Sequence, residues 1–214
     1  MLKVWGRRSS LNVQKVMWLI GELQLPHEHI PAGGTFGRLD EAQFRALNPH
    51  GRVPVIQDGE LAVWESHAIL RYLAAQYGGG RFWSDDPAAR SQVDRWMDWA
   101  QTTLQPAFIE GVFLTYFRTP PTRRDPALIA RNVQRCGQLF QHLDEVMRHE
   151  PVLAQAEPTL ADIPIAANLY RYFELDIERP KLPRIEAWYA RLQQRSAYRE
   201  HVMVSFEELR GREP

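Results

Sequence analysis

The spacing of apolar residues changes once along this chain, near residue 80, and this change limits the fold more than any other feature. Before it, short strand-like runs alternate with segments of helical spacing; beyond it, strand signals disappear and long amphipathic helices follow. The expected strand segments are 2–6, 26–30 and a hairpin at 53–66, and the expected helices are 12–23, 40–47, 66–78, 90–117, 127–149, 159–175 and 182–202.

The order strand–helix–strand, helix, hairpin–helix in the first part is typical of a thioredoxin-like sheet with a right-handed βαβ crossover. Turn-forming residues cluster at 78–90 and indicate a linker. We therefore place a thioredoxin-like α/β domain at residues 1–80 and an all-α helical bundle domain at residues 88–214.

Charge and cysteine usage exclude several classes of function. The formal net charge is zero, so no basic field attracts nucleic acid or anionic lipid. The single cysteine, Cys136, lies on the apolar face of an expected helix and cannot form a disulfide within the chain. No segment reaches the roughly 18 uninterrupted apolar residues of a membrane span. We expect a cytoplasmic protein, and no metal site at His27 and His29, which alternate along a strand.

The segment NPHGRVPVI, residues 48–56, places a proline where a strand should begin. Proline cannot donate a hydrogen bond to a strand ladder, so Pro54 is unusual among the β-forming residues Val53, Val55 and Ile56. We predict a cis Val53–Pro54 bond that presents the backbone of Val53 to an extended peptide ligand. The alternative is a trans proline on an edge strand.

The segment ESHAI, residues 65–69, opens an expected helix. The first amides of a helix lack partners within it and favour anions. Ser66 and this helix start suit a ligand carboxylate, and Glu65 suits an ammonium. The pair therefore matches the end of an α-amino acid, although Ser66 could also do no more than cap its own helix.

Three polar residues, Ser9, Ser10 and Asn12, cluster where the first helix should begin. Capping that helix needs one of them. A thiolate placed there would meet hydroxyl donors and the positive end of the helix. A hydrogen bond to a charged group contributes roughly 1.5–3 kcal/mol, enough to move a thiol pKa toward neutrality.

These motifs, together with the later TLADI at residues 159–163, resemble the cytosolic glutathione transferase superfamily over nearly the whole chain. SSLNVQKV, residues 9–16, is similar to the theta-like serine group of bacteria. The resemblance implies that Val53, before the cis proline Pro54, binds the cysteinyl backbone of glutathione. It assigns the γ-glutamyl end to Glu65 and Ser66. Two further candidates for glutathione contacts are Arg52, toward the glycine carboxylate or peptide backbone, and His67.

The same resemblance implies that Ser10 stabilises the glutathione thiolate, with Asn12 and then Ser9 as the alternatives. No tyrosine precedes Tyr72 and no cysteine lies in the first domain, so tyrosine-type and cysteine-type mechanisms are not expected. In this family the helical domain contributes the electrophile pocket. The candidates for that pocket are Phe108, Phe113, Tyr116 and Phe117, some of which must be core at helical spacing.

The function implied is a detoxifying glutathione S-transferase that conjugates glutathione to a small hydrophobic electrophile. Glutathione is a co-substrate, and no cofactor or metal is expected. The family implies a homodimer. A glutathione-dependent disulfide reductase or peroxidase on the same fold remains the first alternative, and a non-enzymatic glutathione-binding scaffold the second. The TLADI segment is expected to cap a helix and serve folding, with Thr159 and Asp162 three residues apart.

Overall fold

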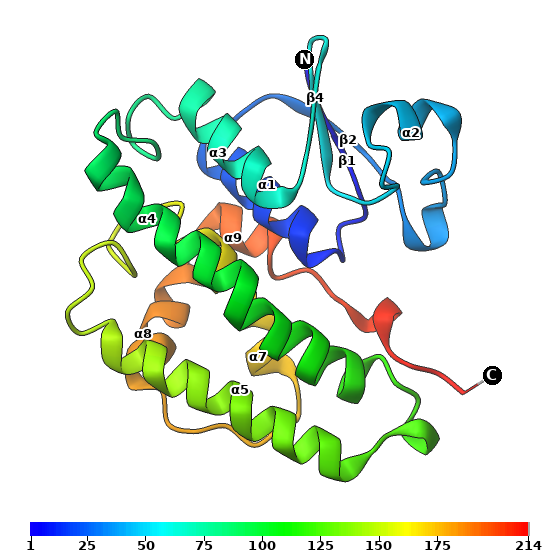
Figure 1. The fold of residues 1–214 in the computed structure, drawn as a ribbon, viewed down its shortest axis with the longest axis vertical. Helices are drawn as coiled ribbons and strands as arrows, with labels where there is room; N and C mark the ends of the chain where they lie inside the picture. The colour runs from blue at the N-terminus through cyan, green and yellow to red at the C-terminus, as the bar shows by residue number, and fades with distance from the viewer. Residues whose placement is uncertain (214) are drawn as a thin grey trace. The chain divides into compact units, whose positions relative to one another are not determined.

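The computed structural model describes residues 1–213, which divide into two compact units. The first unit comprises Met1–Asp85 and Ser196–Val204, and the second comprises Asp86–Arg195 and the chain from Ser205 onward (Figure 1). The first division follows Asp85, inside the segment expected as a linker.

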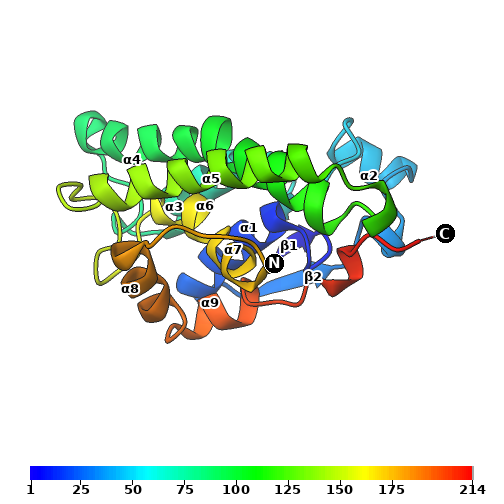
Figure 2. The ribbon, with the colours of Figure 1, turned by 90° about the horizontal axis from the view of Figure 1, so that it is seen from below.

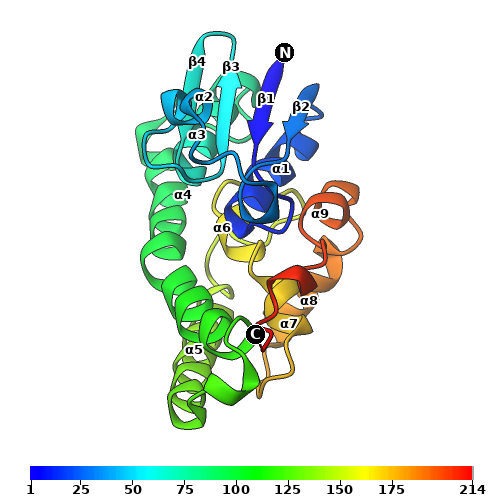
Figure 3. The ribbon, with the colours of Figure 1, turned by 90° about the vertical axis from the view of Figure 1, so that its right-hand side faces the viewer.

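The first unit is built on a four-stranded mixed sheet with strand order β2-β1-β3-β4, as Figure 3 shows. β1 pairs with β2 in parallel and with β3 in antiparallel fashion, and β3 pairs with β4 in antiparallel fashion. This topology confirms the predicted thioredoxin-like fold. The strands are β1 (Leu2–Trp5), β2 (His27–Ile30), β3 (Val55–Asp58) and β4 (Leu61–Trp64).

Helices cover both faces of this sheet, with α1 (Leu11–Glu22) and α3 (Ser66–Tyr77) on one side and α2 (Ala42–Leu47) on the other (Figure 1). Trp5 and Val55 are register partners, so they share a face, and both are buried in one cluster with Phe44 of α2. α1 is buried nearly all round, as expected of a helix enclosed by other elements.

The expected helix at 182–202 is wrong, because the chain forms two helices there: α8 (Pro183–Leu192) and α9 (Ser196–His201). α9 belongs to the first unit, where it packs against α1. The ring of Tyr198 meets that of Trp18 edge to face, with centroids 4.9 Å apart. Because the helix breaks between Leu192 and Ser196, α8 belongs to the second unit and α9 to the first.

The second unit consists of helices (Figure 2). α4 (Pro87–Trp99) continues into π-helical turns, η2 (Ala100–Leu104) and η3 (Pro106–Phe117), where a single helix over residues 90–117 was expected. α5 (Pro126–Val146) runs alongside η3. Asp86 and Asp125 cap α4 and α5 by accepting hydrogen bonds from backbone amides of the first turn.

The expected helix at 159–175 is likewise divided, into α6 (Asp162–Ala166) and α7 (Leu169–Glu174). The side chain of Asp162 is fully buried and accepts from the backbone amides of Ala154 and Thr159, each at 2.7 Å. Burial raises the pKa of Asp162 to about 6, and the hydrogen bonds from Thr159 and Ala154 oppose that rise. The carboxylate therefore fastens the preceding loop to the start of α6, as the predicted capping role requires.

We predict that Asp162→Ala lowers the free energy of unfolding by about 2–4 kcal/mol, because two buried amides lose their acceptor. Urea denaturation monitored by tryptophan fluorescence measures this change. Asp125→Ala is the matched control, since its cap is exposed, and it should cost only about 1 kcal/mol. Equal losses in the two variants would contradict the role assigned to burial.

A second prediction concerns the α1–α9 contact. A Cβ at Gly21 would lie 2.9 Å from Cβ of Ala197, whereas one at Gly111 would meet nothing closer than 3.7 Å. Gly21→Ala should therefore lower the free energy of unfolding by about 1–2 kcal/mol through overpacking. Gly111→Ala should raise it by up to about 1 kcal/mol through helix propensity. A stabilising Gly21→Ala in the same denaturation assay would contradict this close packing.

Candidate functional site

The sheet register brings four loops to one end of the first unit. Val55, the first residue of β3, pairs with Trp5 at the end of β1 and with Trp64 at the end of β4. Ile30 at the end of β2 also pairs with Trp5. The segments that follow β1 and β4 and the segment that precedes β3 therefore meet at this edge, and they carry the three motifs singled out in the sequence.

The first of these segments leads into α1. Ser10 is the N-cap residue, with extended backbone, yet its side chain makes no capping hydrogen bond. Its backbone amide donates to the Arg7 carbonyl at 3.0 Å, which fixes the turn. The Ser10 hydroxyl is partly exposed beside the unpaired amides of the first helical turn. This arrangement suits an anionic ligand atom.

The two alternatives to Ser10 are placed differently. Ser9 is buried, with 4% of its surface exposed. Asn12 lies in the first turn of α1, and its Oδ1 atom is buried without a hydrogen-bond partner among the described residues. An oxygen acceptor cannot stabilise a thiolate, so Asn12 could help only through its Nδ2 donors.

The second segment confirms the predicted cis bond between Val53 and Pro54. Val53 precedes the ladder that starts at Val55, so its N–H and C=O lie outside the strand pairing. It also lies close to the first segment, since a Cβ at Gly6 would be 3.3 Å from Cβ of Val53. The Arg52 side chain is exposed at the same place.

Sequence reasoning missed Asn48, whose side chain forms hydrogen bonds with the backbone of this segment. Asn48 is 3% exposed; its Nδ2 donates to the Arg52 carbonyl at 2.9 Å and its Oδ1 accepts from the His50 amide at 3.0 Å. Both bonds hold the loop just before the cis bond. The signal was available, because Asn before Pro is typical of a turn whose side chain bonds its own backbone.

The third segment joins β4 to α3. Glu65 has a positive φ of 69°, rare for a residue with a side chain, and its side chain is exposed. Ser66, the first residue of α3, is 4% exposed. The backbone thus turns sharply and places a carboxylate beside the unpaired amides of a helix start. An ammonium and a carboxylate from one ligand would both find partners here.

His67 faces the interior of the first unit. It is 7% exposed, and its Nε2 lies 3.2 Å from Nζ of Lys15, which is fully buried on α1. Burial, followed by the charges of Lys15 and Arg71, lowers the pKa of His67 to about 2. The imidazole is therefore neutral. Its contact with glutathione stays a prediction.

Three of the four expected electrophile-pocket residues lie in the core of the second unit: Phe108, Phe113 and Phe117 are at most 3% exposed. Phe108 packs edge to face on Tyr172, and Phe113 stacks on Phe117. Tyr116 differs, because it is partly exposed and lines a pocket of about 450 Å³. The guanidinium of Arg124, which also lines this pocket, lies over the ring of Tyr116.

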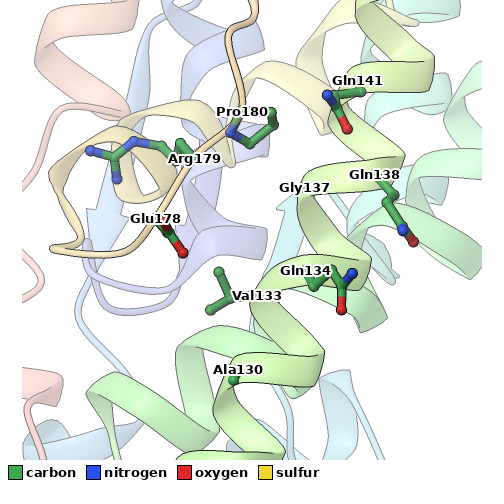
Figure 4. A pocket seen from close by; sticks show the side chains of 9 residues that line it. All are labelled: Ala130, Val133, Gln134, Gly137, Gln138, Gln141, Glu178, Arg179 and Pro180. Carbon is green, nitrogen blue, oxygen red and sulfur yellow. The ribbon is translucent and has the colours of Figure 1, made fainter.

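A second pocket of about 430 Å³ lies along α5, and its lining includes Val133, Gly137 and Gln141 of α5 and Pro180 (Figure 4). Arg179, at its rim, donates from Nη1 to the carbonyls of Tyr172 and Leu175 and so closes the end of α7. None of the residues predicted to bind a substrate lines this pocket.

Histidines beside the sheet have structural partners. His29 Nε2 donates to the Gly6 carbonyl at 2.7 Å, and His27 Nδ1 donates to the Leu25 carbonyl at 2.9 Å. Within residues 1–213, no group of three or more metal-binding side chains occurs, and no helix is long and apolar enough to cross a membrane.

A cis proline, a serine at the start of α1 and a Glu-Ser pair at the start of α3 meet at one end of a thioredoxin-like sheet, the arrangement that the resemblance to glutathione transferases predicts. Family comparisons agree. Residues 1–75 match the glutathione S-transferase N-terminal domain, and residues 104–196 match the glutathione S-transferase C-terminal domain. The chain belongs to the glutathione S-transferase family.

Individual relatives cover nearly the whole chain. Glutathione S-transferase GstB of Escherichia coli is 42% identical over 206 residues, which are 95% of this chain and 99% of that protein. The theta class glutathione S-transferase of Xanthomonas axonopodis, solved with glutathione bound, has a TM-score of 0.88 at 43% identity and covers 96% of this chain and 98% of that one. Maize glutathione S-transferase 3 is 27% identical over 94% of this chain and 93% of its own length.

The geometry of Glu65 gives a prediction that separates stability from binding. Left-handed backbone at a residue with a side chain costs about 1–3 kcal/mol, which glycine avoids. The greater conformational entropy of glycine in the unfolded chain offsets part of this gain. Glu65→Gly should therefore leave the free energy of unfolding unchanged or raise it by about 1 kcal/mol. Its affinity for glutathione should fall at least about tenfold, because a charged hydrogen-bond partner is lost.

Glu65→Gln is the matched control for this variant, because it keeps the side-chain length and the left-handed backbone but removes the charge. It should lose affinity to a similar degree with no gain in stability. Isothermal titration with glutathione and urea denaturation give the two quantities. Full affinity in both variants, or a clear loss of stability in Glu65→Gly alone, would contradict the assignment.

Proposed function

We propose that this chain conjugates glutathione to small hydrophobic electrophiles, using the end of the sheet where the segments around Ser10, Val53 and Glu65 meet. The convergence of these segments through the pairing of Val55 with Trp5 and Trp64 supports the proposal. Glutathione is the co-substrate, in keeping with the family.

Glutathione binding is proposed to use the backbone first. The N–H and C=O of Val53, outside the strand ladder, pair with the cysteinyl residue of the ligand as an added strand would. The γ-glutamyl carboxylate binds the start of α3 and the Ser66 hydroxyl, while its ammonium pairs with Glu65. Arg52, exposed beside Val53, is placed for the glycine carboxylate.

The thiol is proposed to lose its proton to solvent when it binds at the start of α1. The single observation that carries this step is the Ser10 side chain, which occupies the N-cap position without capping the helix. Its hydroxyl is therefore available to donate to a thiolate. One such bond, at roughly 1.5–3 kcal/mol, lowers a thiol pKa by about one to two units, and the helix start adds to it.

The thiolate then attacks the electrophilic carbon, forming the carbon–sulfur bond as the leaving group departs with its electron pair. We propose that the helical domain supplies the electrophile's contacts. Tyr116 is the favoured contact among the four candidates, because Phe108, Phe113 and Phe117 are committed to the core.

A disulfide-reducing activity would use the same thiolate. Cys136, the only cysteine, is buried in the second unit, and burial raises the pKa of its thiol to about 12. The protein thus offers no reactive thiol for a mixed disulfide. Reduction of a disulfide by two molecules of glutathione needs no protein thiol either, so what favours the conjugating reaction is that the relatives are named glutathione S-transferases.

We further propose a cytoplasmic homodimer. A single buried cysteine fits a reducing compartment.

The catalytic assignment is tested by the rate of conjugation of 1-chloro-2,4-dinitrobenzene under saturating glutathione. Ser10→Ala should lower kcat about 10- to 100-fold, the loss expected for one charge-assisted hydrogen bond. Asn12→Ala should change it less than about threefold, because the proposal assigns the thiolate to the hydroxyl of the N-cap residue Ser10 and not to the Nδ2 donors of Asn12. Ser91→Ala, on the exposed surface of α4, is the matched control and should leave kcat unchanged.

The same three variants assayed with glutathione and bis(2-hydroxyethyl) disulfide separate the two reactions. Faster turnover of the disulfide than of the aryl halide by the unmodified protein would favour the reductase. A loss of conjugation confined to Asn12→Ala would reassign the thiolate partner.

A further inference from the structure

Two neighbouring arginines follow β1, and their side chains take different directions. The Arg8 guanidinium donates from Nη2 to the Glu200 carbonyl on α9, 2.9 Å away. Arg7 is partly buried instead, and its side chain lies against the turn that Gly33 and Gly34 form. A Cβ on Gly33 would lie 3.3 Å from Nη1 of Arg7, and one on Gly34 would lie 3.2 Å from its Cδ. The two glycines therefore leave the space that the Arg7 side chain fills.

The Arg7 guanidinium lies beside two parts of the proposed thiol site. A Cβ on Gly33 would also lie 3.7 Å from Cγ2 of Val53, so Val53 and the guanidinium approach the same point. The Ser10 amide donates to the Arg7 carbonyl at 3.0 Å, so Ser10 and Arg7 share one turn. Val53 is the proposed partner of the cysteinyl backbone, and Ser10 is the proposed partner of its sulfur. A positive charge is thus placed where the cysteine side chain of the ligand is proposed to bind.

Other charged side chains near this point are placed differently. The charged or titratable residues on the adjoining segments include Arg8, Lys15, His29, Arg38, Arg52 and Glu65. His29 donates from Nε2 to the Gly6 carbonyl at 2.7 Å, and burial lowers its pKa, so the ring is uncharged at pH 7. The lysine contacts His67 of α3. The three arginines are exposed, so water and salt screen their charges more than that of Arg7.

We propose that the guanidinium of Arg7 faces the sulfur of bound glutathione and, together with the Ser10 hydroxyl, stabilises its thiolate. The inference rests on the proposed function, because it takes the start of α1 as the thiol site. The thiol releases its proton to solvent, and the electron pair of the S–H bond stays on the sulfur beside the cation. A positive charge within about 4–6 Å of an acid favours the ionised form and lowers its pKa by about 1–3 units.

The pKa of the bound thiol, measured from the ultraviolet thiolate absorbance of glutathione between pH 5 and 10, tests this role. Arg7→Met should raise that pKa by about one unit relative to the unmodified protein, because the cation is lost. Arg8→Met is the matched control, since it removes the neighbouring charge that is directed to α9, and it should leave the pKa unchanged. An unchanged pKa in Arg7→Met, or equal shifts in the two variants, would overturn the proposal.

A second pair of variants moves the guanidinium without removing its charge. A Cβ on Gly34 would press on the Arg7 side chain, whereas one on Gly37 would meet nothing within 4 Å. The two glycines have nearly equal φ angles, 61° and 62°, so alanine brings the same backbone strain to both. Gly34→Ala should therefore raise the pKa of the bound thiol, and Gly37→Ala should not. Equal pKa values in these two variants would contradict the position assigned to the guanidinium.

S-methylglutathione separates a role at the sulfur from a role at a carboxylate of the ligand. Its blocked thiol cannot ionise, so Arg7→Met should bind it within about threefold of the unmodified protein in isothermal titration. A loss of about tenfold or more, the effect of removing one charged hydrogen bond, would place Arg7 at a ligand carboxylate and overturn the proposal. Failure of the unmodified protein to bind S-methylglutathione would instead contradict the proposed function.

Discussion

The site depends on one constraint, the pairing of Val55 with Trp5 on one side and Trp64 on the other. A shift of one residue in either pairing would turn every side chain of the strand to the opposite face, so the buried face fixes the register. The register then decides which loops meet. It places the segments before β3 and after β1 and β4 at one end of the sheet, where three separate motifs can contact one peptide ligand.

Much of this could be predicted from the sequence, because the decisive signals are local. The proline among β-formers indicated the cis Val53–Pro54 bond, and helix-start residues located Ser10 and Ser66 within one position of each start. The alternation of strand and helix spacing predicted the thioredoxin-like sheet. These features arise from backbone chemistry within a few residues, so one sequence carries them.

Features set by packing could not be predicted. The break between α8 and α9 sends Tyr198 onto Trp18, a contact between residues far apart in the chain. Helical spacing alone did not separate Tyr116 from the buried Phe108, Phe113 and Phe117. Lys15 gave no signal either, because a lysine in an amphipathic pattern is ordinarily assigned to the solvent face, and its burial follows from enclosure of α1 by α3 and α9.

The central claim is that the start of α1 turns bound glutathione into a thiolate. The ultraviolet thiolate absorbance of glutathione bound to the protein, titrated from pH 5 to 10, tests it most directly. The account predicts a bound thiol pKa at least about one unit below the value of free glutathione. Glutathione that binds with the pKa it has in free solution would contradict the claim, and the protein would then be a glutathione-binding scaffold.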